Sequence, residues 1–123
     1  MLANTVIAAY RAHPGCEDQL LELLYSHYPT LHRLGLVTDD GAIVLRSPED
    51  SAFVEIFEWS SQEAIRIAHE SSEVNSLWAG LHDVADYITL GNLKESGRPF
   101  AKFEHVATIH QEASSRAAFV GAA

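Results

Sequence analysis

The segment from Phe53 to Leu81 constrains the fold more than any other part of the chain. It reads FVEIFEWSSQEAIRIAHESSEVNSLWAGL. Residues 53–59 have the aromatic and β-branched content of a strand. The following Ser60-x-x-Glu63 matches a capping box, which predicts a short helix ending near His69. A serine at 71 or 72 can cap a second helix, and the apolar residues that follow recur at helical spacing as far as Ala85.

The remainder of the chain supplies further strands and one long helix. The His-Pro-Gly sequence at 13–15 ends a first strand, and a helix of residues 17–33 carries leucines at helical spacing. Pro29 lies inside that helix and predicts a kink or a restart near Tyr28. Residues 87–90 could form a short strand or the end of a helix. The expected strands are Thr5–Arg11, Ala42–Arg46, Phe53–Trp59 and Phe100–Ile109.

The order of these elements predicts the fold class. It is β-α-β-β-α-(α)-β, the split β-α-β pattern of ferredoxin-like folds. We therefore expect an α+β domain over residues 1–109, with a mainly antiparallel, four-stranded sheet and its helices on one face. Residues 110–123 form a C-terminal tail that could dock on this domain or on a partner subunit.

The strands look apolar on both faces, although the helices can cover only one of them. On the first strand, Val6, Ala8 and Tyr10 share one face, while Ile7 and Ala9 lie on the other. A second copy of the chain, packed sheet on sheet, is the simplest cover for the remaining face. The sequence therefore predicts a homodimer.

Charge excludes two classes of partner. The chain of 123 residues has 17 acidic against 8 basic residues, a formal charge of −9, which disfavours nucleic acid and anionic membrane surfaces. No stretch is long and apolar enough for a membrane helix. Cys16 is the only cysteine, so no intrachain disulfide can form. We expect a soluble, cytoplasmic protein.

Two stretches resemble a known family. VIAAYRAHPGCEDQLLELL and FVEIFEWSSQEAIRIAHESSEV are similar to characteristic parts of antibiotic-biosynthesis-monooxygenase-like (ABM) domains of the dimeric α/β-barrel superfamily, over residues 3–107. The resemblance implies a homodimer whose two sheets form a barrel, with a small-molecule pocket between each sheet and its helices. The superfamily includes cofactor-free monooxygenases acting on polycyclic phenols, haem-degrading enzymes and lactone isomerases.

The haem-degrading subgroup is matched poorly. Its pattern is an asparagine on the first strand, a tryptophan in the second helical region and a histidine about ten residues later. Asn4 could match the first residue, but Trp59 and His69, which have the right order and spacing, begin on a strand. We therefore expect no cofactor.

Three residues are candidates for catalysis. Glu55 shares a strand face with Phe53, Phe57 and Trp59, so it is either a pocket base with a raised pKa or the partner of Arg11, Arg46 or Lys102 on a neighbouring strand. His69 could be a base, or could simply favour the negative end of its helix. His82 lies one helical turn after Trp78 and titrates near the expected pocket.

Four residues are candidates for substrate binding, namely Trp78, Trp59, Tyr10 and Asn4. Core packing is the alternative for Trp78, which belongs to the apolar stripe of its helix. The histidines show no metal-binding spacing, so no metal site is expected. Two hypotheses follow. One is a cofactor-independent monooxygenase or isomerase acting on a small hydrophobic, aromatic or conjugated substrate, and the other is a non-catalytic dimer that binds a ligand or another protein.

Overall fold

The computed structural model describes residues 3–110. The tail expected at 110–123 lies outside these residues, apart from His110. The strands are β1 (Thr5–Ala12), β2 (Ala42–Arg46), β3 (Ala52–Glu58), β4 (Ala85–Ile88) and β5 (Glu104–Ile109), and the α-helices are α1 (Glu17–Arg33), α2 (Gln62–Glu70) and α3 (Ser72–Val84). Two short 3-10 turns, η1 (Leu90–Asn92) and η2 (Lys94–Gly97), connect β4 to β5.

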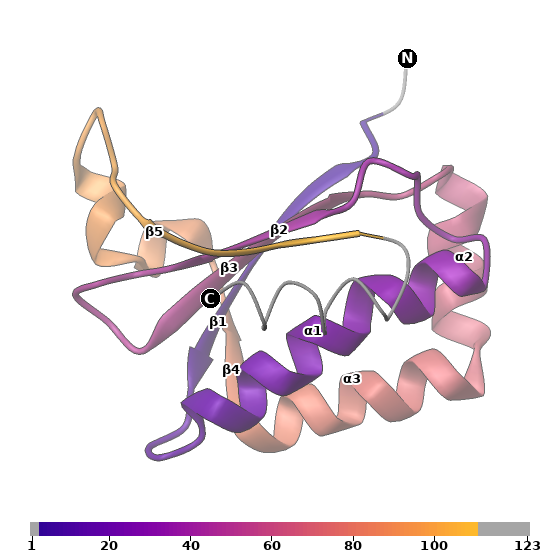
Figure 1. Cartoon of the computed structure of the whole chain (residues 1–123), viewed down its shortest axis with the longest axis horizontal. Coiled ribbons are helices and arrows are strands. Elements are labelled where there is room, and N and C mark those ends of the chain that lie inside the picture. Colours follow the sequence, from indigo (N-terminus) through magenta and orange to yellow (C-terminus); the bar gives the residue numbers. More distant parts are fainter. Residues whose placement is uncertain (1–2, 111–123) are drawn as a thin grey trace.

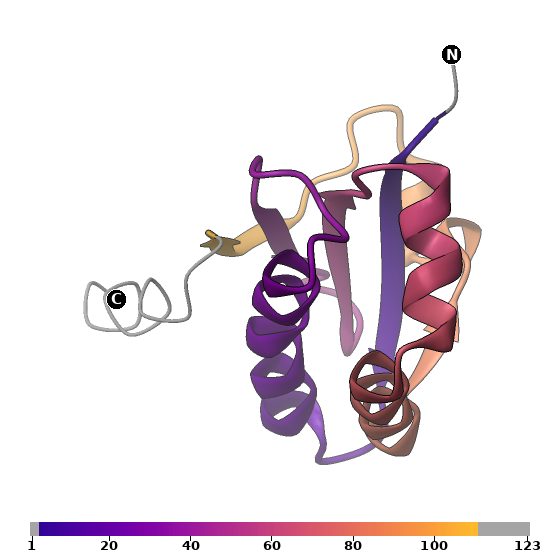
Figure 2. The same cartoon turned by 90° about the vertical axis from the view of Figure 1, so that its right-hand side faces the viewer.

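One open sheet carries all the strands in this part of the chain. Its order is β4-β1-β3-β2-β5, and every neighbouring pair is antiparallel. The three α-helices lie on one face of it (Figures 1 and 2). The protein is therefore an α+β structure compatible with a ferredoxin-like fold. None of the helices within residues 3–110 is both long enough and apolar enough to cross a bilayer.

The expected number of four strands is wrong. The sequence left residues 87–90 open between strand and helix end, and the structure places a strand, β4, at residues 85–88, paired with the second half of β1. The last predicted strand shortens to β5, which pairs with β2 at the opposite edge. The difference arises because pairing partners far apart in the chain decide which short segments become strands. The sheet consequently has five strands.

Helix α1 covers the centre of the sheet with an apolar stripe. Its boundaries match the predicted ones, and it continues through Pro29 without a restart. Proline removes one backbone donor, and burial of the surrounding stripe compensates for this loss. The buried residues of α1 are Leu20, Leu24, His27, Tyr28 and Leu31. All of them except His27 are in the main hydrophobic core.

The predicted capping box is shifted by one residue. Ser61, not Ser60, is the N-cap of α2, and its hydroxyl accepts a hydrogen bond from the Ala64 N–H at 3.0 Å. Ser60 instead donates to the carbonyl of Gly35. Glu63 then falls one position too early to close the box, and it binds Arg66. Ser71, one of the two serines that the sequence offered, caps α3.

The outer face of the sheet is covered only in part by the chain itself. Leu93, between the two 3-10 turns, is buried against Ala9, Ala52 and Val54. Ile7 and Ile43 remain 46% and 41% exposed on this face. Both are paired in register with Ile56 of β3, so the three isoleucines form a row across three strands. We refer to them as the isoleucine row.

Candidate functional site

Glu55 is a carboxylate in the middle of the sheet with no exposed surface. Its position on β3 turns it toward the helices, between Ala8 of β1 and Val44 of β2. It accepts a hydrogen bond from the Tyr10 hydroxyl at 2.8 Å and another from Nδ1 of His27 at 2.9 Å. Sequence reasoning offered arginine or lysine partners, and this alternative is wrong. Arg11 pairs with Asp50, and Arg46 pairs with Glu104.

Trp78 determines the protonation of His27. The indole N–H of Trp78 lies 3.0 Å from Nε2 of His27. An indole nitrogen can only donate, so Nε2 must carry the lone pair. The single ring proton is therefore on Nδ1, where it is donated to Glu55. His27 is therefore neutral, with one nitrogen that donates and one that accepts. We call these four side chains, Glu55, His27, Trp78 and Tyr10, the Glu55 network.

The charge of Glu55 acts on its tyrosine neighbours. Burial, and then the nearby Glu55 carboxylate, raise the pKa of Tyr10 far above its usual range. The same two causes raise the pKa of Tyr87, whose ring meets Tyr10 edge to face at 5.4 Å. Both phenols consequently remain protonated at neutral pH. Tyr10 is thus a permanent hydrogen-bond donor to the carboxylate and cannot be a base.

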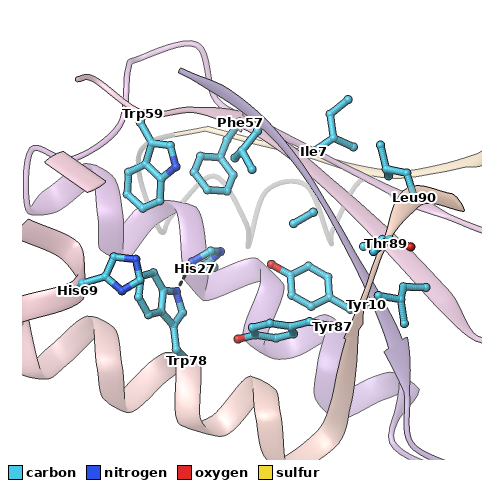
Figure 3. A pocket seen from close by; sticks show the side chains of 14 residues that line it. Ile7, Tyr10, His27, Phe57, Trp59, His69, Trp78, Tyr87, Thr89 and Leu90 are labelled. Carbon is cyan, nitrogen blue, oxygen red and sulfur yellow. Dashed lines mark hydrogen bonds between the residues drawn. The ribbon is translucent and has the colours of Figure 1, made fainter. Parts of the chain in front are cut away.

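A cavity of about 350 Å³ lies beside this network. Aromatic rings from four elements form much of its wall, and two imidazoles reach it (Figure 3). The aromatic residues and histidines that line it are Tyr10, Phe57, Trp59, Trp78, Tyr87, His27 and His69. Its volume is within the range of small-molecule sites, and flat rings favour stacking with a flat ligand. The cavity can therefore hold a small aromatic molecule.

His69 is the accessible titratable group of the pocket. It lies in the last turn of α2, is exposed, and places its ring 5.0 Å from that of Trp78. Neither of its ring nitrogens has a hydrogen-bond partner within residues 3–110. His69 can thus take a proton from a bound molecule, whereas both nitrogens of His27 are already bonded.

Some of the predicted site residues line the pocket, and others lie outside it. Tyr10, Trp59, Trp78 and His69 all line the pocket. Asn4 lies outside the lining, and its side chain accepts a hydrogen bond from Gln62. His82 is also outside the lining, with its ring stacked on Tyr87 at 4.2 Å. Glu55 does not line the pocket either, but it anchors Tyr10 and His27, which do.

His27 was not among the predicted site residues. A signal for it is nevertheless present in the sequence, because Leu20, Leu24, His27 and Leu31 follow the 4-3-4 spacing of a buried helical stripe. A histidine on such a stripe needs a polar partner when it is buried. A buried carboxylate was already expected on the facing strand, so the two could have been paired.

Within residues 3–110, no group of three or more histidine, cysteine, aspartate or glutamate side chains is arranged to hold a metal ion. The pocket therefore offers hydrogen-bonding and stacking groups rather than a ligand set for a metal.

Comparison with known proteins leaves the function to be argued from this geometry: no protein-family model matches the chain, and no curated protein matches it either.

Proposed function

We propose that the protein is an ABM-like enzyme, a cofactor-independent monooxygenase or isomerase acting on a small aromatic or conjugated substrate. One observation carries the proposal: an aromatic-lined cavity contains the unbonded imidazole of His69 next to Trp78, whose indole is held in place by His27. A cavity filled by core side chains would have favoured a purely structural role. An open cavity with two histidines supports chemistry instead.

The first step is removal of a proton by His69. A phenol stacked against the pocket aromatics would transfer its proton to the imidazole. The electron-rich anion can then react with dioxygen directly. A C–H bond is broken, a C–O bond is formed and the second oxygen atom leaves as water. The substrate loses four electrons and dioxygen gains four, so no further reductant is needed.

Isomerisation uses the same first step without an oxidant. His69 would remove a proton from a carbon between a carbonyl and a C=C bond and return it to a different carbon, which brings the double bond into conjugation with the carbonyl. Atoms and electrons are conserved within the substrate, and the imidazole returns to its neutral form. The pocket therefore supports both reactions through one base.

Two substrates separate these reactions. Oxygenation of 1-naphthol to 1,4-naphthoquinone is followed by oxygen consumption and absorbance, and isomerisation of α-angelica lactone is followed by absorbance. We expect turnover of at least one of them, and a decrease of about 100-fold or more when His69 is replaced by glutamine. His82→Gln is the matched control, because His82 is also exposed in the last turn of a helix but lies outside the pocket. Equal losses in the two variants, or no turnover by the wild type, would contradict the proposal.

A non-catalytic ligand-binding protein is the second candidate. The observation that favours it is that both ring nitrogens of His27 are already hydrogen-bonded. His69 is then the accessible imidazole of the pocket. Both tryptophans of the chain line the cavity, so quenching of their fluorescence measures binding directly. Binding of 1-naphthol without turnover, and unchanged in His69→Gln, would favour this candidate.

We further propose that two copies of the chain pack through the outer faces of their sheets. The support is the isoleucine row, where exposed apolar side chains of neighbouring strands form a continuous strip. Such a strip costs free energy when it faces water and gains it when a second strip covers it. The proposed dimer is the one implied by the resemblance to ABM domains.

A further inference from the structure

Strand β1 has a partner along only half of one edge. On its β3 side it is paired from Thr5 to Arg11, but β4 pairs only with Ala9–Ala12. Residues 5–8 therefore have no neighbouring strand on the β4 side within the described part of the chain. The pocket lies at this place, because residues 6–10 of β1 and residues 87–90 at the end of β4 all contribute to its lining.

The direction of each backbone group in β1 follows from three hydrogen bonds. The Asn4 carbonyl accepts from Trp59, and the Ala12 N–H donates to Ser51, so these residues point toward β3. The His13 N–H donates to Val84, so it points toward β4. Backbone groups alternate in direction along a strand. Even-numbered residues of β1 thus face β3, and odd-numbered residues face the β4 side.

Ile7 is the first odd-numbered residue beyond the end of the β1–β4 ladder. Continuation of the register from Ala9 and Ile88 would pair it with Leu90, but the chain turns into η1 there and no such bond forms. The N–H and C=O of Ile7 consequently have no partner within residues 3–110. Ile7 and Leu90 lie across the pocket from His69 (Figure 3). Unpaired backbone groups in an apolar wall favour a ligand that can pair with them.

We propose that the main-chain N–H of Ile7 is a binding subsite for a carbonyl oxygen of the ligand, and that the pocket therefore selects aromatic carbonyl compounds. This inference rests on the proposed function, because it takes the pocket as the site of an aromatic substrate. The N–H donates to the oxygen at one end of the conjugated system while His69 removes the proton at the other. The Ile7 carbonyl accepts from a neighbouring hydroxyl or N–H of the ligand.

The consequence is selectivity for the oxygen. A hydrogen bond that strengthens as negative charge collects on that oxygen stabilises the anion more than the neutral substrate. An analogue with a CH₂ group in place of the carbonyl would leave the Ile7 N–H unpaired and buried under the ligand. Sites built around a hydrogen bond discriminate strongly against ligands that lack the partner.

The test compares 1-indanone with indane, which has the same ring skeleton without the oxygen. Spectra of the ¹⁵N-labelled protein would follow the amide of Ile7. Two amides of β1 that also point toward the β4 side serve as controls: Thr5, which lies outside the pocket, and Ala9, which is already paired with β4. We expect 1-indanone to move the Ile7 amide proton to higher frequency, while indane does not. Equal effects of the two compounds, or no effect of either on the pocket amides, would overturn the inference.

Replacement of Ile7 by proline removes the N–H itself. Proline is tolerated on an edge where the N–H is not used by the sheet, so the variant should fold. We expect 1-indanone to bind about 5-fold more weakly to Ile7→Pro and indane to bind as it does to the wild type. Ile7→Val retains the N–H and should retain the affinity for 1-indanone. Since these readouts need no turnover, a protein that binds 1-indanone in this way but lacks activity would refute only the proposed reaction.

Discussion

Trp78 donates its indole N–H to Nε2 of His27 across 3.0 Å, and this contact joins helix α3 to helix α1. The two residues are 51 positions apart in the chain. Because the donor cannot accept, the contact also leaves the imidazole proton on Nδ1, facing Glu55. A tryptophan on one helix thereby sets the hydrogen bond that a second helix makes with the sheet.

Replacement of Trp78 by phenylalanine should release this constraint. Nε2 of His27 would lose its hydrogen-bond donor, and its ¹⁵N signal should shift, while Nδ1 keeps its proton for Glu55. Loss of a buried hydrogen bond should also lower the free energy of unfolding by about 1–2 kcal/mol in urea titrations.

Trp59→Phe is the matched control for this prediction. Trp59 also lines the pocket, but its indole has no hydrogen-bond partner within residues 3–110. The same change of ring size there should leave the His27 signals as they are, because the bond between Trp78 and His27 is retained. The indicated role of Trp78 would be wrong if both variants lost the same stability with no change in the imidazole spectrum.

Tyr10 should stabilise the fold in a pH-dependent way. Its pKa is raised in the folded protein, while the unfolded chain loses the phenol proton near pH 10. The unfolded state therefore binds fewer protons above that pH, so the stability falls as the pH rises. Tyr10→Phe should be about 1–2 kcal/mol less stable at pH 7, and the difference from wild type should shrink above about pH 10.

Tyr87→Phe provides the comparison at pH 7. Tyr87 is 47% exposed, and its hydroxyl has no hydrogen-bond partner within residues 3–110. Removing that hydroxyl should change the free energy of unfolding by less than about 0.5 kcal/mol. A loss in Tyr87→Phe as large as that in Tyr10→Phe would show that the bond to Glu55 contributes nothing specific.

The isoleucine row predicts how the proposed homodimer can be broken. Ile43→Glu places a charge in the isoleucine row, where desolvating it would cost more than the contact gains. We expect sedimentation velocity to show a dimer for the wild type and a monomer for this variant. Ile67→Glu is the control, because Ile67 is 42% exposed but lies on helix α2, away from the outer face. A monomeric wild type would refute the proposed dimer.

Several features of the fold could be predicted from local patterns. The boundaries of α1 and the cap of α3 agree with expectation, since both depend on residues a few positions apart. The cap of α2 was misplaced by one residue because two adjacent serines offer the same chemistry. Only the extended backbone of Ser61 and the contact of Ser60 with Gly35 distinguish them.

Only part of the candidate site could be predicted from the sequence. Glu55 stood out because a charge on an aromatic strand face is unusual, and Tyr10, Trp59, Trp78 and His69 were named for their chemistry. The partner of Glu55 was missed, since His27 is 28 residues away on a helix whose rotation relative to the sheet has no local signal. His82 was expected in the pocket but lies outside it, because its ring stacks on Tyr87 of β4, a strand that the sequence left uncertain.

The sequence by itself determined the three α-helices, four of the strands and the position of Glu55 on a strand face with aromatic side chains, because periodicity and capping act over a few residues. Only the tertiary structure decided that a fifth strand, β4, would form and stop short of Ile7, that Glu55 would be held by Tyr10 and His27, and that Trp78 would hold His27. These outcomes depend on strand register and helix packing. Both are set by contacts between residues far apart in the chain, which no local pattern specifies.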